Sequence, residues 1–166
     1  IELIAGMHDK DGRVTLPGFY DRVRPISKEE HEDFTRLPVD DQFFLDQTKV
    51  PALWGEPEFL PAERTGARPT LEVNGFLSGF TGEGSKTVLP AWAMAKISCR
   101  LVPDQNPDDV HQQMRDYLQT HAPATVRWTL EKMAGSPASI SDRHSPGVQA
   151  MRKALESVWR AKTVFR

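Results

Sequence analysis

The stretch TLEVNGFLSGFTGEGSKTVLPAWAMAKISCRLV, residues 70 to 102, contains the two clearest strand patterns in the chain. In its first part apolar and polar residues alternate, and this alternation predicts a strand with one buried face. The apolar positions of that strand are Leu71, Val73 and Leu77. A glycine-rich connection follows and a second alternating segment comes after it, so the two strands are predicted to form an antiparallel hairpin.

The second strand pattern covers residues 91–101 and separates two faces. One face is small and apolar: Ala91, Ala93, Ala95, Ile97, Cys99 and Leu101. The other face is Trp92, Met94, Lys96, Ser98 and Arg100. Cys99 is therefore expected to point toward the core, and Arg100 away from it. Arg100 is either a solvated charge on an open sheet face or a fork for a carboxylate, a group that guanidinium geometry suits well.

The connection GFTGEGSKT, residues 79 to 87, has some features of a phosphate-binding loop. That loop requires the lysine directly after the second glycine, whereas Ser85 intervenes here. A phosphate-binding loop also opens a helix, and Pro90 with its β-branched flank disfavours a helix start at this point. The segment is therefore interpreted as a connection between two strands.

The composition is that of a soluble globular protein. The chain has 166 residues, of which 39% are hydrophobic and 27% charged, and its net charge is −2. This charge gives no electrostatic reason to expect nucleic acid or an anionic membrane as a partner, and no apolar run reaches membrane-spanning length. The single cysteine excludes a disulfide framework and fits a reducing compartment, so we expect a cytoplasmic protein.

The first half of the chain is irregular and contains short predicted helices. IELIAGM, residues 1 to 7, has the pattern of the tail of a helix, so we expect the chain to be a fragment of something longer. Ser27 and Glu30 form a capping-box pattern for a helix over about 28–37, and a second helix is expected over 40–48. Residues 51–68 are rich in proline and glycine and are expected to form a long connection. We interpret residues 14–66 as a helical excursion from a simpler core.

The second half contains three further predicted elements. Asn106 and Pro107 begin a helix, whose apolar stripe is Val110, Met114, Tyr117 and Leu118. TVRWTLEK, residues 125 to 132, alternates and predicts a strand, and Ser145 with Pro146 begins a last helix. If one strand precedes the first helix, the order becomes β-α-β-β-α-β. The sequence thus predicts an α+β protein, a ferredoxin-like split sandwich with its first strand missing and a helical insertion.

The candidate polar sites have ordinary alternatives. His144 lies just before the last helix, where it could donate to a substrate carboxylate or carbonyl, or be a polar loop residue. His31 and Asp33 have the spacing of a metal-ligand pair, but their acid-rich helix favours a solvated face. We find no convincing metal-ligand set and no nucleophile-and-base arrangement in the sequence.

Residues 68 to 110 carry three motifs: PTLEVNG, G-x-G-S-K-T-V-L-P and R-L-V-P-x-Q-x-P. They resemble the lid domain of the co-catalytic zinc metallopeptidases. That family includes cytosolic nonspecific dipeptidase, carnosinase, acetylornithine deacetylase and succinyl-diaminopimelate desuccinylase, and the dipeptidase branch is the most similar. The resemblance covers nearly the whole chain. It implies a lid and dimerisation domain over residues 1–144 and a helix, residues 145–166, that leads back toward a catalytic domain.

In that family two zinc ions are held by the separate catalytic domain, so the resemblance implies no catalytic and no metal-binding residue here. It implies three substrate contacts. Thr87 matches the threonine of the SKTVLP segment, Arg100 matches the arginine of RLVP that binds the substrate's carboxylate, and His144 matches the histidine before the last lid helix. The family's other lid histidine, and the first lid strand, would precede Ile1.

We therefore expect the lid and dimerisation domain of a dipeptidase-like zinc enzyme, inactive alone. The parent would act as a homodimer on a peptide with a free carboxylate, with no nucleic-acid or membrane partner. The alternative is a free-standing ferredoxin-like binding or regulatory module. An RNA-binding sheet needs exposed stacking aromatics and a basic surface, whereas the expected open face offers Trp92 alone and the net charge is −2.

Overall fold

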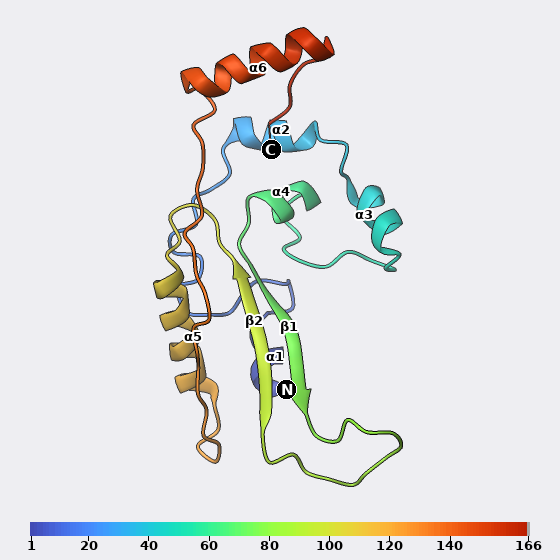
Figure 1. Cartoon of the computed structure of the whole chain (residues 1–166), viewed down its shortest axis with the longest axis vertical. Helices are drawn as coiled ribbons and strands as arrows, with labels where there is room; N and C mark the ends of the chain where they lie inside the picture. Colours follow the sequence, from blue (N-terminus) through green and yellow to red (C-terminus); the bar gives the residue numbers. More distant parts are fainter. Residues whose placement is uncertain (166) are drawn as a thin grey trace.

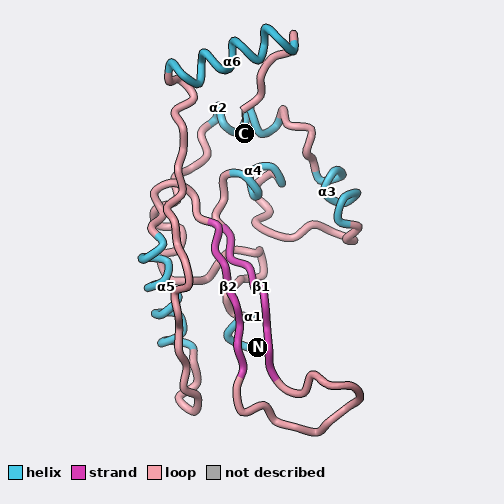
Figure 2. The backbone as a smooth tube through the Cα atoms, in the orientation of Figure 1, coloured by secondary structure: helices cyan, strands magenta, loops and turns pink. Residues whose placement is uncertain are grey.

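The computed structural model describes residues 1–165 and shows an elongated α+β arrangement (Figures 1 and 2). The elements in chain order are α1 (Glu2–Ala5), α2 (Lys28–Thr35), α3 (Asp41–Thr48), α4 (Pro61–Gly66), β1 (Thr70–Ser78), β2 (Ala93–Arg100), α5 (Pro107–His121) and α6 (Pro146–Trp159). The hairpin loop lies at one end of the long axis and α6 at the other, with α5 beside β2 (Figure 1). None of the helices in this part of the chain is long and apolar enough to cross a membrane.

The predicted hairpin is confirmed, because β1 pairs with β2 in antiparallel register. Leu71 lies opposite Cys99 and Val73 opposite Ile97, as the alternation predicts for the core-facing side. The register then shifts between Val73 and Gly75, which makes Asn74 a β-bulge.

The bulge corrects the predicted face of Leu77. Directly opposed residues share a face, and one extra residue in a strand exchanges the faces of everything beyond it. Leu77 therefore pairs with Met94 on the polar face, and Phe76 pairs with Ala95 on the core-facing side. Alternation counted along the sequence fails here because the bulge is a property of the pairing.

The core forms where the first residues of the chain meet α5 and the start of β1. Its buried members are Met7, Val14, Leu16, Phe19, Leu71, Val110, Met114 and Tyr117. Three of the four stripe residues predicted for α5 are among them, and the fourth, Leu118, packs against the cluster. Three further members, between residues 14 and 19, come from the segment interpreted as an excursion.

Three hydrogen bonds over long sequence separations fix this packing. Tyr117 donates its hydroxyl to the Leu3 carbonyl at 2.8 Å. Two glutamine amides bind a turn at the start of the excursion: Gln113 donates to the Gly18 carbonyl at 2.9 Å, and buried Gln105 to the Phe19 carbonyl at 2.8 Å. The N-terminal segment is therefore tied to α5 and to the loop that precedes it.

The excursion helices follow their capping residues. The capping box of Ser27 and Glu30 is confirmed at the start of α2, which ends two residues earlier than predicted. Asp40 caps α3 by accepting from the Phe43 amide at 2.8 Å. The sequence missed α4, which lies inside the predicted connection. It begins at Pro61, and Glu63 accepts from the Leu60 amide at 2.8 Å.

A buried ion pair joins this connection to the start of β1. Arg68 donates two hydrogen bonds to Glu56, both at 2.7 Å, and both side chains are nearly inaccessible. The Arg13 guanidinium lies 3.2 Å from the same carboxylate. The Arg68 guanidinium also lies over the Phe59 and Tyr20 rings, at 4.2 and 5.1 Å from their centroids. Opposite charges and aromatic faces together compensate for removing the two groups from water.

The strand predicted over residues 125–132 is absent from the described structure, so that prediction is wrong. The sheet of residues 1–165 consists of β1 and β2 alone. The segment runs extended beside α5 (Figure 1), with Leu130 packed against the core and Val126 exposed. A strand needs a neighbour that pairs with its backbone groups, and among these residues none lies beside the segment.

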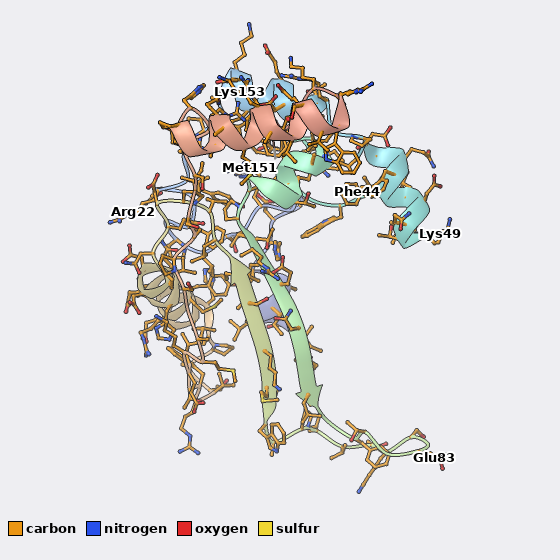
Figure 3. The ribbon with its side chains drawn as sticks, turned by 45° about the horizontal axis from the view of Figure 1, so that its top comes forward. Arg22, Phe44, Lys49, Glu83, Met151 and Lys153 are labelled. Carbon is orange, nitrogen blue, oxygen red and sulfur yellow. The ribbon has the colours of Figure 1, made fainter. Side chains whose placement is uncertain are left out.

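The last helix makes few contacts with the rest of the described chain. Met151, Leu155, Val158 and Trp159 are all exposed. Met151 and Lys153 lie on opposite sides of α6 (Figure 3). The helix is thus amphipathic, but its apolar side is largely uncovered.

Candidate functional site

The three predicted substrate contacts lie in different parts of the molecule. Thr87 belongs to the exposed loop between β1 and β2, Arg100 ends β2, and His144 lies just before α6. Because β2 has eight residues and a strand rises about 3.3 Å per residue, its two ends lie about 23 Å apart. The structure therefore separates Thr87 from Arg100 by the length of the strand, and one chain does not bring the two together.

Arg100 lies where the alternation predicts. It pairs in register with Thr70, and on the same face Ser98 and Glu72 make a hydrogen bond of 3.5 Å. The Arg100 side chain is exposed, and within residues 1–165 no carboxylate forms an ion pair with it. Its guanidinium thus remains available to a carboxylate from outside the described chain.

His144 directly precedes the segment that enters α6, which lies toward the end of the molecule to which β2 runs (Figure 1). Its backbone amide donates to the Asp142 side chain at 2.8 Å, and its Nε2 lies 3.6 Å from a Glu29 oxygen. The preceding Arg143 makes ion pairs with Asp33 at 2.7 Å and with Glu29 at 3.1 Å. The segment before α6 is therefore attached to α2, a connection that no sequence spacing indicated.

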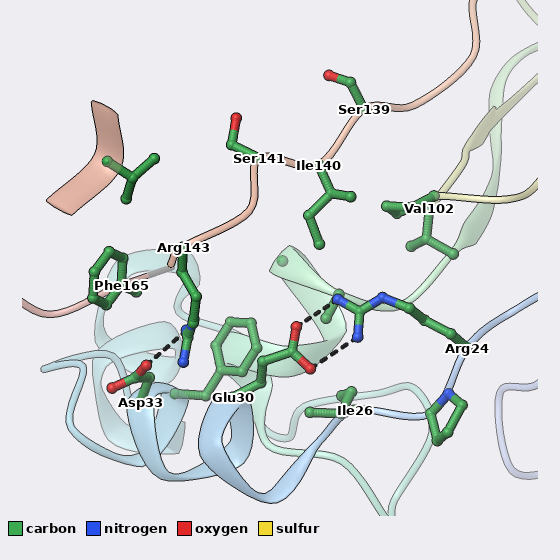
Figure 4. A pocket seen from close by; sticks show the side chains of 16 residues that line it. Arg24, Ile26, Glu30, Asp33, Val102, Ser139, Ile140, Ser141, Arg143 and Phe165 are labelled. Carbon is green, nitrogen blue, oxygen red and sulfur yellow. Dashed lines mark hydrogen bonds and ion pairs between the residues drawn. The ribbon is translucent and has the colours of Figure 1, made fainter. Parts of the chain in front are cut away.

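A cavity of about 380 Å³ lies between α2, the end of α4 and residues 139–143 (Figure 4). On one wall Arg24 holds Glu30 through two hydrogen bonds, one of them 2.9 Å. The Arg24 guanidinium, with help from the Ser27 amide, lowers the pKa of Glu30 to about 2. Arg143 on the other wall is paired as well (Figure 4). None of the three predicted contacts lines this cavity, and its charges already compensate one another.

The possible metal pair of His31 and Asp33 has other partners. His31 Nδ1 lies 2.6 Å from the buried carboxylate of Glu63, and Asp33 pairs with Arg36 and Arg143. Residues 1–165 contain no group of three or more side chains able to hold a metal ion. A zinc site therefore does not fit the described part of the chain.

Burial shifts the pKa values of two other side chains that could be reactive, Cys99 and His8. Burial, followed by the charge of Glu72, raises the pKa of the Cys99 thiol to about 11, so the thiolate is disfavoured. Burial also lowers the pKa of His8, whose ring meets that of Trp54 edge-on at 5.1 Å. Neither arrangement provides an activated nucleophile.

Comparison with known proteins identifies relatives of the whole chain. A β-Ala-His dipeptidase from Rattus norvegicus is 28% identical over 164 residues, which are 96% of this chain and 33% of the relative. A Cys-Gly metallodipeptidase from Candida albicans is 25% identical over 166 residues, with the same two coverages. The chain spans about a third of the length of these curated relatives.

The solved structures agree. A metallo-carboxypeptidase from Sulfolobus solfataricus is similar with a TM-score of 0.77 and 28% identity, over 98% of this chain and 37% of that one. Human carnosine dipeptidase 1 shares the fold, with a TM-score of 0.73 and 23% identity, over 94% of this chain and 34% of that one. The family described as the peptidase dimerisation domain matches residues 1–126, and this chain therefore belongs to that family.

Proposed function

We propose that the chain is the lid and dimerisation domain of a zinc metallopeptidase that hydrolyses dipeptides or related amide bonds. The main support for this proposal is the match to the peptidase dimerisation domain family, together with relatives that are named as dipeptidases. The fold is the ferredoxin-like split sandwich, in which a further strand lies between β2 and the extended segment 125–132. The parent is a cytoplasmic enzyme.

Catalysis belongs to the rest of the parent, in which two zinc ions would activate water. We propose that this part supplies substrate contacts and is inactive alone; the lack of a metal-ligand group among residues 1–165 supports this. Residues 145–166 lead back to the catalytic domain, and the exposed apolar side of α6 would pack against it. Arg100 binds the substrate carboxylate through two parallel hydrogen bonds, and Thr87 and His144 add polar contacts to the substrate.

The separation of Thr87 from Arg100 favours a site shared by two copies. The ends of an eight-residue strand, about 23 Å apart, are too distant for one dipeptide. Thr87 of one copy would meet Arg100 and His144 of the other. The uncovered apolar side chains near the loop support such pairing, among them Phe80, Leu89 and Trp92.

The role of Arg100 is tested in the full-length enzyme with β-Ala-His and Cys-Gly, each as the free acid and as the C-terminal amide. Arg100→Ala should lower kcat/KM for the free acids by about 30-fold or more, corresponding to roughly 2–5 kcal/mol for one member of a desolvated charge pair. Arg100→Lys should restore little, because lysine lacks the two parallel donors. Equal losses on acid and amide would contradict the carboxylate role.

The shared site is tested by mixing Thr87→Val with Arg100→Ala. A mixed dimer contains one intact site if the two residues come from different copies, so mixing should restore activity that neither variant has alone. If both residues come from the same copy, every site in the mixed dimer carries one defect. An unchanged activity after mixing, with exchange of subunits verified by mass, would exclude the shared site.

A further inference from the structure

The segment before α6 is anchored by a helix from far earlier in the chain. Arg143 makes ion pairs with two carboxylates of α2, with Asp33 at 2.7 Å and with Glu29 at 3.1 Å. Its side chain is only 19% exposed and that of Asp33 only 7%. Ion pairs at such low exposure are screened little by salt and hold a defined geometry. The backbone on either side of Arg143 is therefore fixed relative to α2.

His144 follows directly and shares one of these carboxylates. Its Nε2 lies 3.6 Å from a Glu29 oxygen, so the ring lies beside α2. Its backbone is fixed by Asp142, which accepts from the His144 amide through its side chain and from the Ser145 amide through its carbonyl. The carboxylate beside the ring is thus that of Glu29 from α2.

The anchor itself is held from several sides. Asp33 also pairs with Arg36 at 2.7 Å, and the Arg143 guanidinium lies 4.9 Å from the centroid of the Phe165 ring. His31 of α2 is bound to Glu63 of α4 at 2.6 Å. Helix α2 is therefore held in place by α4, and displacing the segment around Arg143 would break several interactions together.

We propose that Glu29 and Asp33 are positioning residues, which hold His144 through Arg143 in the orientation that meets substrate. This inference rests on the proposed function for the contact between His144 and substrate. It gives the excursion between residues 14 and 66 a task, because its first helix orients a residue that comes much later in the chain. A preoriented histidine loses less conformational freedom when substrate binds, so the carboxylates act mainly on binding.

The positioning itself is tested on the 166-residue chain by NMR of the His144 imidazole. Glu29→Gln and Asp33→Asn should each shift the ring signals of His144. Glu32→Gln is the matched control, since Glu32 is an exposed glutamate of the same helix whose carboxylate makes no ion pair within residues 1–165. Glu29 is 56% exposed, so its variant should fold even if Asp33→Asn does not. Unmoved signals in Glu29→Gln, or equal shifts in the Glu32→Gln control, would overturn the proposal.

The consequence for substrate is tested in the full-length enzyme with β-Ala-His and Cys-Gly. Glu29→Gln and Asp33→Asn should each raise KM by about fivefold and change kcat less, with no further effect in a His144→Ala background. If His144→Ala leaves the kinetics unchanged, the proposed contact fails while the NMR result stands. If His144→Ala impairs binding but the α2 variants add to it in full, or have no more effect than Glu32→Gln, the positioning role is wrong.

Discussion

The two ends of the β1–β2 hairpin have similar sequences and opposite surroundings. At the end near Arg100, Leu71 is 4% exposed and Ile97 and Cys99 pack against the core. At the loop end, Phe76 on the same core-facing side is 48% exposed, and Leu77 and Met94 on the other face are 40% and 42% exposed. The difference lies in what covers the strands, because the core cluster takes its strand residues, Leu71, Ile97 and Cys99, from the first end.

The comparison shows that a strand pattern specifies which face can be buried, but not how much of its length is covered. The open end continues into the loop, where Val88 and Leu89 are also exposed. A run of uncovered apolar side chains this long is unusual in a monomer and marks a contact surface. We therefore expect the packed end to carry the stability of the described chain, and the open end is the surface that we propose for association.

The largest effect is expected at the buried charges beside the packed end. Glu56→Ala leaves Arg68 buried without its partner, which should lower the free energy of unfolding by about 3–5 kcal/mol. Urea denaturation of the chain measures this value. Glu58→Ala removes an exposed carboxylate that pairs with Arg13, and should cost less than about 1 kcal/mol. Similar losses from the two variants would contradict the assignment of stability to the packed end.

The next effect compares two leucines of one strand. Leu71→Ala empties a buried site and should cost about 2–5 kcal/mol, including the cavity left behind. Leu77→Ala makes the same change beyond the bulge, on an exposed surface, and should cost under about 1 kcal/mol. Denaturant midpoints with matching slopes give both values. If Leu77→Ala costs as much as Leu71→Ala, the open end is covered in solution.

The smallest effect is expected in the alkylation rates of cysteines at the two ends of β2. With its pKa raised from the ordinary 9.0 to about 11, Cys99 should be alkylated at pH 8 about 100-fold more slowly than a free thiol. A cysteine placed by Met94→Cys at the open end should react at an ordinary rate. The raised pKa also contributes stability that is fully present below pH 9 and is lost as the pH rises toward 11. Rapid alkylation of Cys99 in the folded chain would show that the packed end opens.

Much of the fold was predictable from local patterns. The hairpin, the capping box of Ser27 with Glu30, and the buried stripe of α5 follow from residues close together in sequence. The bulge at Asn74 was not predictable, because it depends on how two strands pair. The strand expected over residues 125–132 failed for a related reason. Alternation there describes an extended segment, and pairing needs a neighbour that the sequence pattern cannot supply.

The candidate site also has one feature that local sequence patterns predict and one that they do not. Alternation along β2 placed Arg100 on the polar face, and the register confirms that position. The attachment of Arg143 and His144 to Glu29 left no signal in the sequence, because the partners are far apart in the chain and belong to ordinary charged patterns. The roles of Thr87, Arg100 and His144 remain predictions drawn from a resemblance, which the kinetic experiments above test.

The hydrogen bond from Tyr117 to the Leu3 carbonyl spans 114 residues, and it has a consequence for synthesis on the ribosome. At about 5–20 residues per second, the N-terminal segment waits roughly 6–20 s before α5 emerges. During that interval Leu16 and Phe19 have no helix to pack against. Nascent chains stalled before α5 should therefore recruit chaperones that bind apolar segments, and chains stalled well beyond it should release them.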